Sequence, residues 1–383
     1  MAKRDFINCE LNLKNEKMTF SMDSQYDALR IINKNGQGYI IKAYDTSNQR
    51  LVAVKMIKEM YDPYNIKRIY REFVIAKTVK HKNLITLLDA FTPEGKNMYF
   101  VYEYMDASMR DYLKLPSSDI NNLTNIVWNP NTGDYFTADI LFQFFCGLRY
   151  LHQDKLKFIH RDIKPENILI KRLSGGNWHL KIHNLALARQ LQEGDVNITN
   201  DFITCPYRAP EVMIGDLYSS AIDLWPVGCI LAEMITGNIL FKKTDQTNQF
   251  LQILHLVGFP EGTNFPTVIK LKIENELNRY GSNRINSNFG DDKLPNWTKQ
   301  RITKEFVRNL LKYLLEFDPN TRLTAEQGTE LLQFEFLEDR SGKNNIAPLS
   351  HNPIDEGGPH TVSEWRQLIN EKLNDYEIKR FQN

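Results

Sequence analysis

The stretch from Phe158 to Ile170 places polar side chains between two apolar runs, in the order F-I-H-R-D-I-K-P-E-N-I-L-I. A carboxylate such as Asp162 can accept a proton, and an ammonium such as Lys164 can lie beside an anion as a point charge. An amide oxygen such as that of Asn167 can ligate a magnesium ion. A chance loop between two strands is the alternative interpretation. Five polar positions at one fixed spacing give that alternative a chance of roughly a few per cent.

The same stretch resembles the catalytic loop of protein kinases, H-R-D-x-K-x-x-N. The resemblance implies that Asp162 accepts the proton of a substrate hydroxyl, that Lys164 lies beside the transferring phosphate, and that Asn167 binds Mg²⁺. It implies ATP and Mg²⁺ as cofactors. It also implies an α+β fold with two lobes, a small β-rich lobe with one main helix and a larger, mainly helical lobe.

The position of the second metal ligand is altered. In protein kinases a strand that ends in Asp-Phe-Gly follows the catalytic loop, and Leu-Ala-Arg comes after it. Here the flanking segments Leu180–His183 and Leu187–Arg189 fix the register, so Asn184 stands where the family has its metal-binding aspartate. Asparagine keeps one amide oxygen, but it lacks the negative charge that Mg²⁺ prefers in its octahedral shell.

Short strands around polar turns are expected near the N-terminus, and Asn35-Gly36 gives the strongest hairpin signal. In protein kinases this hairpin is the glycine-rich loop over the ATP phosphates. Only Gly38 of its three glycines remains in register, because Asn33 and Asn35 occupy the other positions. Taken alone, an ordinary hairpin is the better interpretation of this stretch.

The elements after the hairpin supply the other nucleotide contacts. Leu51–Lys55 matches V-A-I-K, which places Lys55 where the family binds the α- and β-phosphates; a lysine on a solvated strand face is the alternative. A helix is expected over about residues 64–79, from apolar residues at helical spacing. Glu72 lies off that apolar stripe. In isolation it is interpreted as a solvated surface charge, but with Lys55 upstream it becomes the expected ion-pair partner.

Met98–Met105 is expected to be an apolar strand that runs into a hinge. By resemblance, the backbone of Glu103 and Met105 would meet the adenine, and Tyr102 would lie at the back of that pocket. The residues that the resemblance assigns to the nucleotide site are Ile32, Gly38, Ile40, Ala53, Lys55, Glu72, Glu103 and Met105.

The second half of the chain carries further matches. The segment 114–137 is polar and is predicted to be an exposed insertion, and a helix over about 138–153 leads to the catalytic loop. The tripeptide that ends in Glu211 matches A-P-E, the end of the kinase activation segment. Arg322 matches the arginine that pairs with this glutamate in the family, and Asp223–Gly228 matches a buried helix start.

Within the protein kinases the chain looks most like the c-Jun N-terminal kinase branch of the MAP kinases, over about residues 6–377. The segments that carry this likeness are Tyr70–Glu72, His81–Ile85, Asp89–Pro93, Met105–Ala107 and Val362–Ile369. We expect a strand extension over 1–25, a kinase domain over 26–337 with its lobes divided at about 104, and a tail over 338–383. The tail contains a helix over 363–377 with a capping box from Thr361 to Glu364. In MAP kinases such a helix packs on the small lobe; a free partner-binding helix is the alternative.

The activation segment departs from the MAP kinases. Counting back from A-P-E, their Thr-x-Tyr site falls on Thr199-Asn200-Asp201, so phosphorylation at Thr199 remains possible but dual phosphorylation does not. The arginines that correspond to the family's phosphothreonine-binding set are Arg71, Arg161 and Arg189. Cys205-Pro206 replaces an arginine-aromatic pair, so the sequence does not predict proline-directed specificity.

Composition limits the other possibilities. The 383 residues are 42% hydrophobic, which is enough for a large globular unit or two lobes. The formal charge of +1 favours neither nucleic acid nor an anionic membrane as a partner. Four widely spaced cysteines predict no disulfide framework and no metal cage. Met1–Glu10 lacks the apolar core of a signal peptide. By resemblance we expect a monomer in the cytoplasm or nucleus, with protein substrates or binding partners and upstream kinases.

Three functional hypotheses remain open from the sequence. The first is a pseudokinase in stress-type signalling that acts by binding. The second is a weakly active Ser/Thr kinase, because Lys55, Glu72, Asp162, Lys164 and Asn167 remain. The third is a nucleotide sensor that binds ATP without magnesium. Metal stabilisation is worth several kcal/mol, and each ~1.4 kcal/mol is tenfold in rate, so roughly three decades of rate loss are expected from Asn184.

Overall fold

The computed structural model describes most of the chain, in segments. These are residues 4–14, 16–35, 38–58, 63–114, 135–174, 177–191, 205–214, 219–242, 246–258, 271, 275, 278, 305–336 and 361–382. Thr199, Asp201 and all but the ends of the segment 114–137 lie outside the described residues. Two compact units are present, one made of Met1–Asp106, His183–Leu187 and Asn352–Asn383, the other of Ala107–Ile182 and Ala188–His351.

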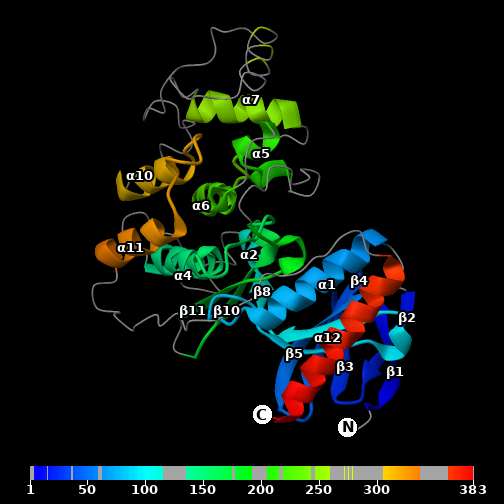
Figure 1. Cartoon of the computed structure of the whole chain (residues 1–383). Coiled ribbons are helices and arrows are strands. Elements are labelled where there is room, and N and C mark those ends of the chain that lie inside the picture. Colours follow the sequence, from blue (N-terminus) through cyan, green and yellow to red (C-terminus); the bar gives the residue numbers. More distant parts are fainter. Residues whose placement is uncertain are drawn as a thin grey trace. The chain divides into compact units, whose positions relative to one another are not determined.

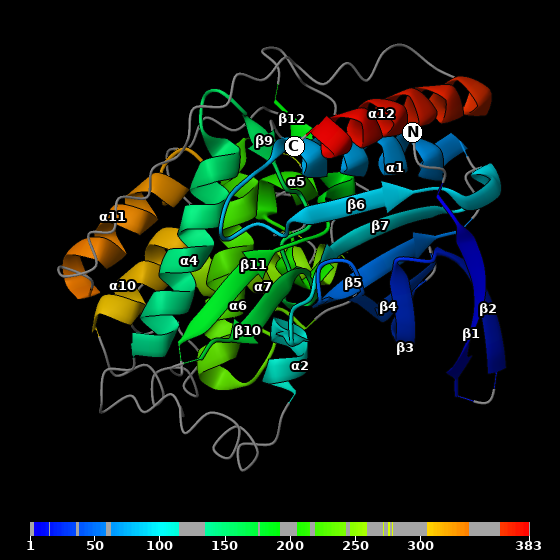
Figure 2. The ribbon, with the colours of Figure 1, turned by 90° about the horizontal axis from the view of Figure 1, so that it is seen from below.

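The first unit contains a five-stranded antiparallel sheet in the order β3-β4-β5-β7-β6 and a separate antiparallel pair, β1-β2 (Figure 2). The strands are β1 (Phe6–Leu13), β2 (Glu16–Asp23), β3 (Tyr26–Asn35), β4 (Gly38–Asp45), β5 (Arg50–Ile57), β6 (Leu87–Phe91) and β7 (Met98–Glu103). The predicted hairpin joins β3 to β4, with Asn35 opposite Gly38. A short 3-10 turn, η1 (Pro93–Gly95), connects β6 to β7.

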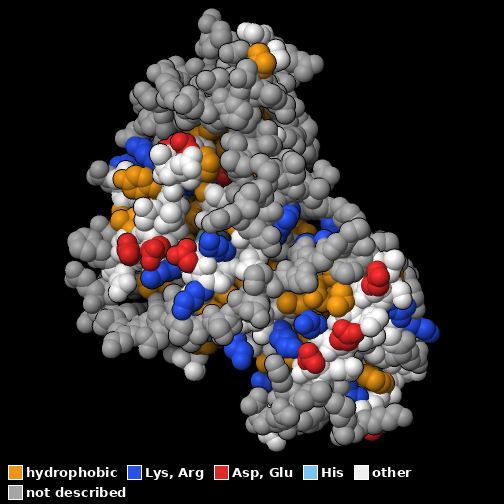
Figure 3. All heavy atoms as spheres, in the orientation of Figure 1, with side chains coloured by type: hydrophobic (Ala, Val, Ile, Leu, Met, Phe, Trp, Pro, Cys, Tyr) orange, Lys and Arg blue, Asp and Glu red, His pale blue; other side chains and the backbone are white. Residues whose placement is uncertain are grey.

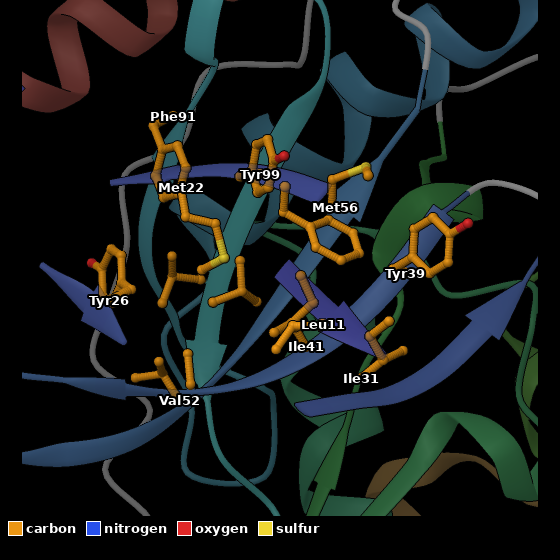
Figure 4. Close-up of a cluster of buried hydrophobic side chains, with 14 residues drawn as sticks. Leu11, Met22, Tyr26, Ile31, Tyr39, Ile41, Val52, Met56, Phe91 and Tyr99 are labelled. Carbon is orange, nitrogen blue, oxygen red and sulfur yellow. The ribbon is translucent and has the colours of Figure 1, made fainter. Parts of the chain in front are cut away.

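The two faces of the large sheet have different coverings. One face meets side chains of β1 and β2 in a closed hydrophobic cluster (Figure 4). Its labelled members are Leu11, Met22, Tyr26, Ile31, Tyr39, Ile41, Val52, Met56, Phe91 and Tyr99. Because successive side chains of a strand point to opposite faces, Ala53 and Lys55 of β5 lie on the other face. That second face carries the residues assigned to the nucleotide site on β4 and β5.

Helix α1 (Pro63–Thr78) covers the second face, and Phe73 stacks on Phe100 of β7 with ring centroids 6.0 Å apart. Helix α12 (Val362–Gln382) lies along α1 (Figures 1 and 2), as expected for the tail helix. Trp365 of α12 is buried against Tyr70 at a centroid distance of 5.0 Å. The predicted capping box is present, because the backbone N–H of Glu364 donates to Thr361 Oγ1 over 3.3 Å and the Glu364 carboxylate accepts the Thr361 N–H.

The second unit is mainly helical. Its helices are α2 (Met109–Leu113), α4 (Tyr135–His152), α5 (Pro210–Ile214), α6 (Leu224–Thr236), α7 (Gln246–Val257), α10 (Glu305–Leu314) and α11 (Ala325–Phe336). Its strands are β8 (Ala107–Ser108), β9 (Phe158–Ile159), β10 (Ile168–Arg172), β11 (Trp178–Ile182) and β12 (Arg189–Gln190). They pair as β11-β10-β8 and β12-β9. Helix α6 is buried along nearly all of its length and packs on α10. It is capped at its C-terminus by Gly237, whose φ of 69° is left-handed.

The fold is therefore α+β, with a sheet-rich unit and a helical unit. Both acidic and basic side chains appear on the face drawn in Figure 3, in line with a formal charge of +1. In the described part of the chain no helix is long and apolar enough to cross a membrane. Cys9, Cys146 and Cys229 are free thiols.

Candidate active site

Lys55 and Glu72 form a closed ion pair in the first unit. The Lys55 Nζ lies 2.7 Å from Glu72 Oε1 and 2.8 Å from Oε2. The Glu72 side chain is only 2% exposed, so its interpretation in isolation as a solvated surface charge is wrong. The reason is tertiary: α1 turns this position toward β5, where the lysine ammonium replaces water as the partner of the carboxylate.

Tyr102 supplies a second donor to the same carboxylate. Its hydroxyl donates to Glu72 Oε1 over 3.0 Å. Burial raises the pKa of Tyr102 well above its ordinary value, and the charge of Glu72 and the hydrogen bond to it raise the pKa further. The phenol therefore stays protonated and remains a donor.

Strand register brings the predicted nucleotide-site residues of β4 and β5 onto one face. Ile40 pairs with Lys55, and Ala53 pairs with Tyr102. Ile32 lies at a register shift of β3 and is 43% exposed. At the other end, the backbone N–H of Glu103 donates to Thr86 O over 3.3 Å and anchors the strand before Met105.

Gly38 has a structural requirement of its own. A Cβ at this position would lie 1.8 Å from the backbone oxygen of Met56 on the neighbouring strand. A side chain here would push β4 away from β5, whether or not a nucleotide binds. The predicted phosphate contact of Gly38 is therefore not needed to explain this glycine.

In the second unit, the polar side chains of the catalytic-loop motif converge. Lys164 Nζ lies 2.8 Å from Asp162 Oδ1. The amide nitrogen of Asn167, in the 3-10 turn η2 (Pro165–Asn167), donates to the Asp162 backbone oxygen over 2.6 Å and to Oδ2 over 2.7 Å. Asp162 is buried, so its carboxylate is held by a cation and an amide in a fixed orientation.

Asp223 fixes the start of this loop by accepting backbone hydrogen bonds from it. It lies at the end of the 3-10 turn η5 (Ser220–Asp223), just before α6, and accepts the backbone N–H groups of His160 over 2.7 Å and Arg161 over 2.8 Å. His152 Nε2 lies 2.9 Å from the same carboxylate. Burial alone would raise the pKa of Asp223, but these hydrogen bonds and the nearby histidines outweigh burial and lower it.

The two residues that the resemblance assigns to metal binding lie one in each unit, Asn167 in the second and Asn184 in the first. The nitrogen of Asn167 faces Asp162, which turns its amide oxygen, a donor of the type Mg²⁺ takes, to the other side. Asn184 lies between β11 and the 3-10 turn η3 (Leu185–Leu187) with a left-handed φ of 69°, a conformation that asparagine tolerates. Both are neutral amides. In the described ranges no group of three His, Cys, Asp or Glu side chains could hold a metal.

The residues assigned to the nucleotide and those assigned to its magnesium ion differ in how well their charges suit these groups. Lys55, held by Glu72, is placed as a phosphate-binding cation. The metal positions lack the acidic ligand that would balance a divalent charge. Lys55 would suit the phosphates of a nucleotide, whereas Asn167 and Asn184 would each supply Mg²⁺ with only a neutral oxygen ligand.

The predicted phosphothreonine arginines are divided between the two units. Arg71 lies half-buried on α1 of the first unit. In the second unit, Arg189 of β12 pairs with Ile159 of β9. Ile159 lies two residues before Arg161, which is buried. The backbone thus brings Arg161 and Arg189 near one another, while the Thr199 that they would serve lies outside the described residues.

Sequence reasoning missed one polar cluster beside the catalytic loop. Arg110 of α2 donates through Nε to Glu166 of η2 over 2.8 Å and through its terminal nitrogens to Glu233 of α6 and to the hydroxyl of Tyr207, in the 3-10 turn η4 (Cys205–Tyr207). The Tyr207 hydroxyl also donates to Glu233 over 2.7 Å. No local pattern marks these residues. From the sequence, only a search for oppositely charged residues in distant segments could have indicated them.

These elements define the class of the protein. Three features are typical of a protein kinase. They are a lysine of the sheet paired with a glutamate of α1, an Asp–Lys–Asn catalytic loop, and a buried Arg322–Glu211 pair at the end of the activation segment. Residues 26–336 match the protein kinase domain family, and the chain belongs to that family.

Its relatives narrow the class. The chain is 34% identical over 378 residues to "Stress-activated protein kinase JNK" of Drosophila melanogaster, covering 95% of each protein. It is 31% identical over 367 residues to the protein of that name from Suberites domuncula, covering 93% of this chain and 95% of the relative. The predicted likeness to the c-Jun N-terminal branch of the MAP kinases is confirmed.

Proposed function

We propose that this chain is a MAP-kinase-like Ser/Thr kinase homologue of stress-type signalling whose phosphoryl transfer is impaired and which acts by binding other proteins. The observation that carries the proposal is Asn184, a neutral amide at the position of the family's charged metal ligand. Its left-handed backbone does not compensate for the missing charge.

The size of the defect follows from the missing charge. Metal stabilisation of a transferring phosphoryl group is worth several kcal/mol, and each ~1.4 kcal/mol changes the rate tenfold. A loss of roughly three decades is therefore the expected effect of Asn184. Asp162 and Lys164 still orient a hydroxyl and an anion, but they cannot replace a metal ligand.

A second candidate, a weakly active kinase, has its own support. The Lys55–Glu72 pair is closed, and Asp162 is held by both Lys164 and Asn167. In protein kinases both the lysine–glutamate pair and the Mg²⁺-binding aspartate after the catalytic loop must be in place for transfer. This chain keeps the pair but has Asn184 at the position of the aspartate, so residual transfer through Asn167 is the form that activity would take.

We propose the remaining features from the family resemblance. Protein partners bind the kinase domain, and an upstream kinase phosphorylates Thr199, whose phosphate pairs with arginines such as Arg161. ATP binds at Lys55 with little help from Mg²⁺. The protein works as a monomer in the cytoplasm or nucleus.

Thermal shift with nucleotide tests this function without requiring catalysis. The wild type and Asn184→Asp are each compared with ATP plus Mg²⁺ and ATP plus EDTA. We expect Mg²⁺ to add little to the shift of the wild type and to add clearly to that of Asn184→Asp. A wild-type shift that depends on Mg²⁺ as strongly as the variant's would contradict the proposal. No shift with ATP plus EDTA would remove the nucleotide-sensor hypothesis.

A further inference from the structure

The Glu72 carboxylate is held from two strands at once. Lys55 on β5 contacts both of its oxygens, and Tyr102 on β7 donates to Oε1. The two donors stand on adjacent strands, since Ala53, two residues before Lys55, pairs directly with Tyr102. The sheet thus provides both donors, and helix α1 provides the acceptor.

The two donors differ in stiffness. A lysine ammonium sits on a flexible four-carbon stem and can follow a carboxylate that moves. A tyrosine hydroxyl sits on a planar ring with only two side-chain torsions. The Tyr102 ring also packs near Phe100, with centroids 6.2 Å apart, so its hydroxyl defines a fixed point to which Glu72 must come.

The residue of α1 that follows Glu72 packs both on the sheet and on helix α12. Phe73, the residue after Glu72, stacks on Phe100 of the sheet and meets Tyr376 of α12 edge-on at 5.9 Å. The Tyr376 hydroxyl in turn donates to Leu88 O over 3.0 Å. These ring contacts hold α1 between sheet and tail helix, but they leave the position of the Glu72 carboxylate to its polar partners.

We propose that Tyr102 is a positioning residue that holds Glu72, and through it Lys55, in the paired arrangement before any nucleotide binds. The phosphate-binding lysine is then ready in the empty protein, and binding of a nucleotide does not have to move α1. The inference concerns the Lys55–Glu72 pair itself. Only its meaning for nucleotide binding rests on the proposed function.

Hydrogen exchange of the backbone amides of α1, without nucleotide, tests the proposal. Tyr102→Phe keeps the ring and removes the hydroxyl. A hydrogen bond to a charged group contributes enough that we expect exchange in α1 to become roughly tenfold faster. Tyr99→Phe is the control, because Tyr99 is a buried tyrosine of the same strand β7 on the opposite face, with its hydroxyl at the backbone of Ser21.

Unchanged exchange in α1 of Tyr102→Phe, or an equal change in Tyr99→Phe, would overturn the proposal. A double-mutant cycle gives the second readout. In the background of Glu72→Gln, whose carboxylate charge is gone, Tyr102→Phe should add less than half of its effect on α1 exchange. Full additivity would show that the hydroxyl acts elsewhere. Because neither measurement uses nucleotide or substrate, failure here is distinguishable from failure of the proposed function.

Discussion

Arg322 and Glu211 form a two-pronged ion pair inside the second unit. Arg322 Nη1 lies 2.6 Å from Glu211 Oε1, and Nη2 lies 2.9 Å from Oε2. Neither side chain is more than 2% exposed. Two parallel hydrogen bonds of this kind fix direction as well as distance, so the pair locks the start of α5 to the segment before α11.

Arg322→Lys should be strongly destabilising although it keeps the charge. A lysine cannot reproduce the planar fork and leaves buried acceptors without their donors, which costs about 2 kcal/mol or more in the free energy of unfolding. Urea denaturation measures the change. Arg149→Lys is the control, because the Arg149–Glu326 pair is exposed and contributes less than about 0.5 kcal/mol. Equal costs for the two substitutions would contradict the prediction.

Lys55→Met should destabilise the first unit even without nucleotide. It leaves the buried Glu72 carboxylate without its cation, and breaking a buried pair in this way costs about 3 kcal/mol. The double variant Lys55→Met with Glu72→Gln should lose less than the sum of the single losses, because a neutral amide needs no cation. Additive losses in chemical denaturation would show that the two side chains are not coupled.

Asp223 should make the stability depend on acid pH. Its folded-state pKa lies below the ordinary value of 3.8, so its stabilising contribution is fully present above that pH. The contribution is lost as the pH falls through the lower folded-state pKa. Asp223→Asn should therefore be less stable than the wild type at pH 6, with a flatter decline of the free energy of unfolding below pH 3.8. Parallel pH profiles for the two proteins would rule this role out.

Trp365→Ala should weaken the attachment of α12 to α1. Trp365 is buried against Tyr70, and removing a buried tryptophan ring costs about 3 kcal/mol. The melting temperature reports the loss. Asn374→Ala, on the exposed side of the same helix, should change stability by less than about 0.5 kcal/mol. If both variants melt alike, α12 does not depend on this contact.

The parts of the site that sequence could predict are those fixed by local spacing. The catalytic loop is one, because Asp162, Lys164 and Asn167 are assigned by a short motif with fixed spacing. The tail helix is another, because its capping box and its apolar residues Trp365, Ile369 and Leu373, which recur every four residues, are both local signals. The sequence gives bounds of 363–377, whereas α12 runs from Val362 to Gln382.

The parts that sequence could not predict depend on distant contacts. The ion pair of Glu72 with Lys55 is expected from the resemblance, but the hydrogen bond that Tyr102 of β7 donates to Glu72 is not. Gly38 resembles a phosphate-binding glycine, yet the approach of the Met56 backbone already requires it. Arg110 contacts Glu233 across 123 residues of sequence, which no periodicity can reveal.

We propose that Asn184 limits phosphoryl transfer in a chain whose Lys55–Glu72 and Asp162–Lys164 pairs are each formed. The most direct measurement is the rate of phosphate transfer to a generic protein substrate by the wild type and by Asn184→Asp. Asp162→Asn in each background gives the rate that does not come from this site. We expect the transfer rate of the wild type to remain near that of Asp162→Asn. The rate of Asn184→Asp should rise well above that of the double variant with Asp162→Asn. Equal, Asp162-dependent rates for wild type and Asn184→Asp would contradict the account.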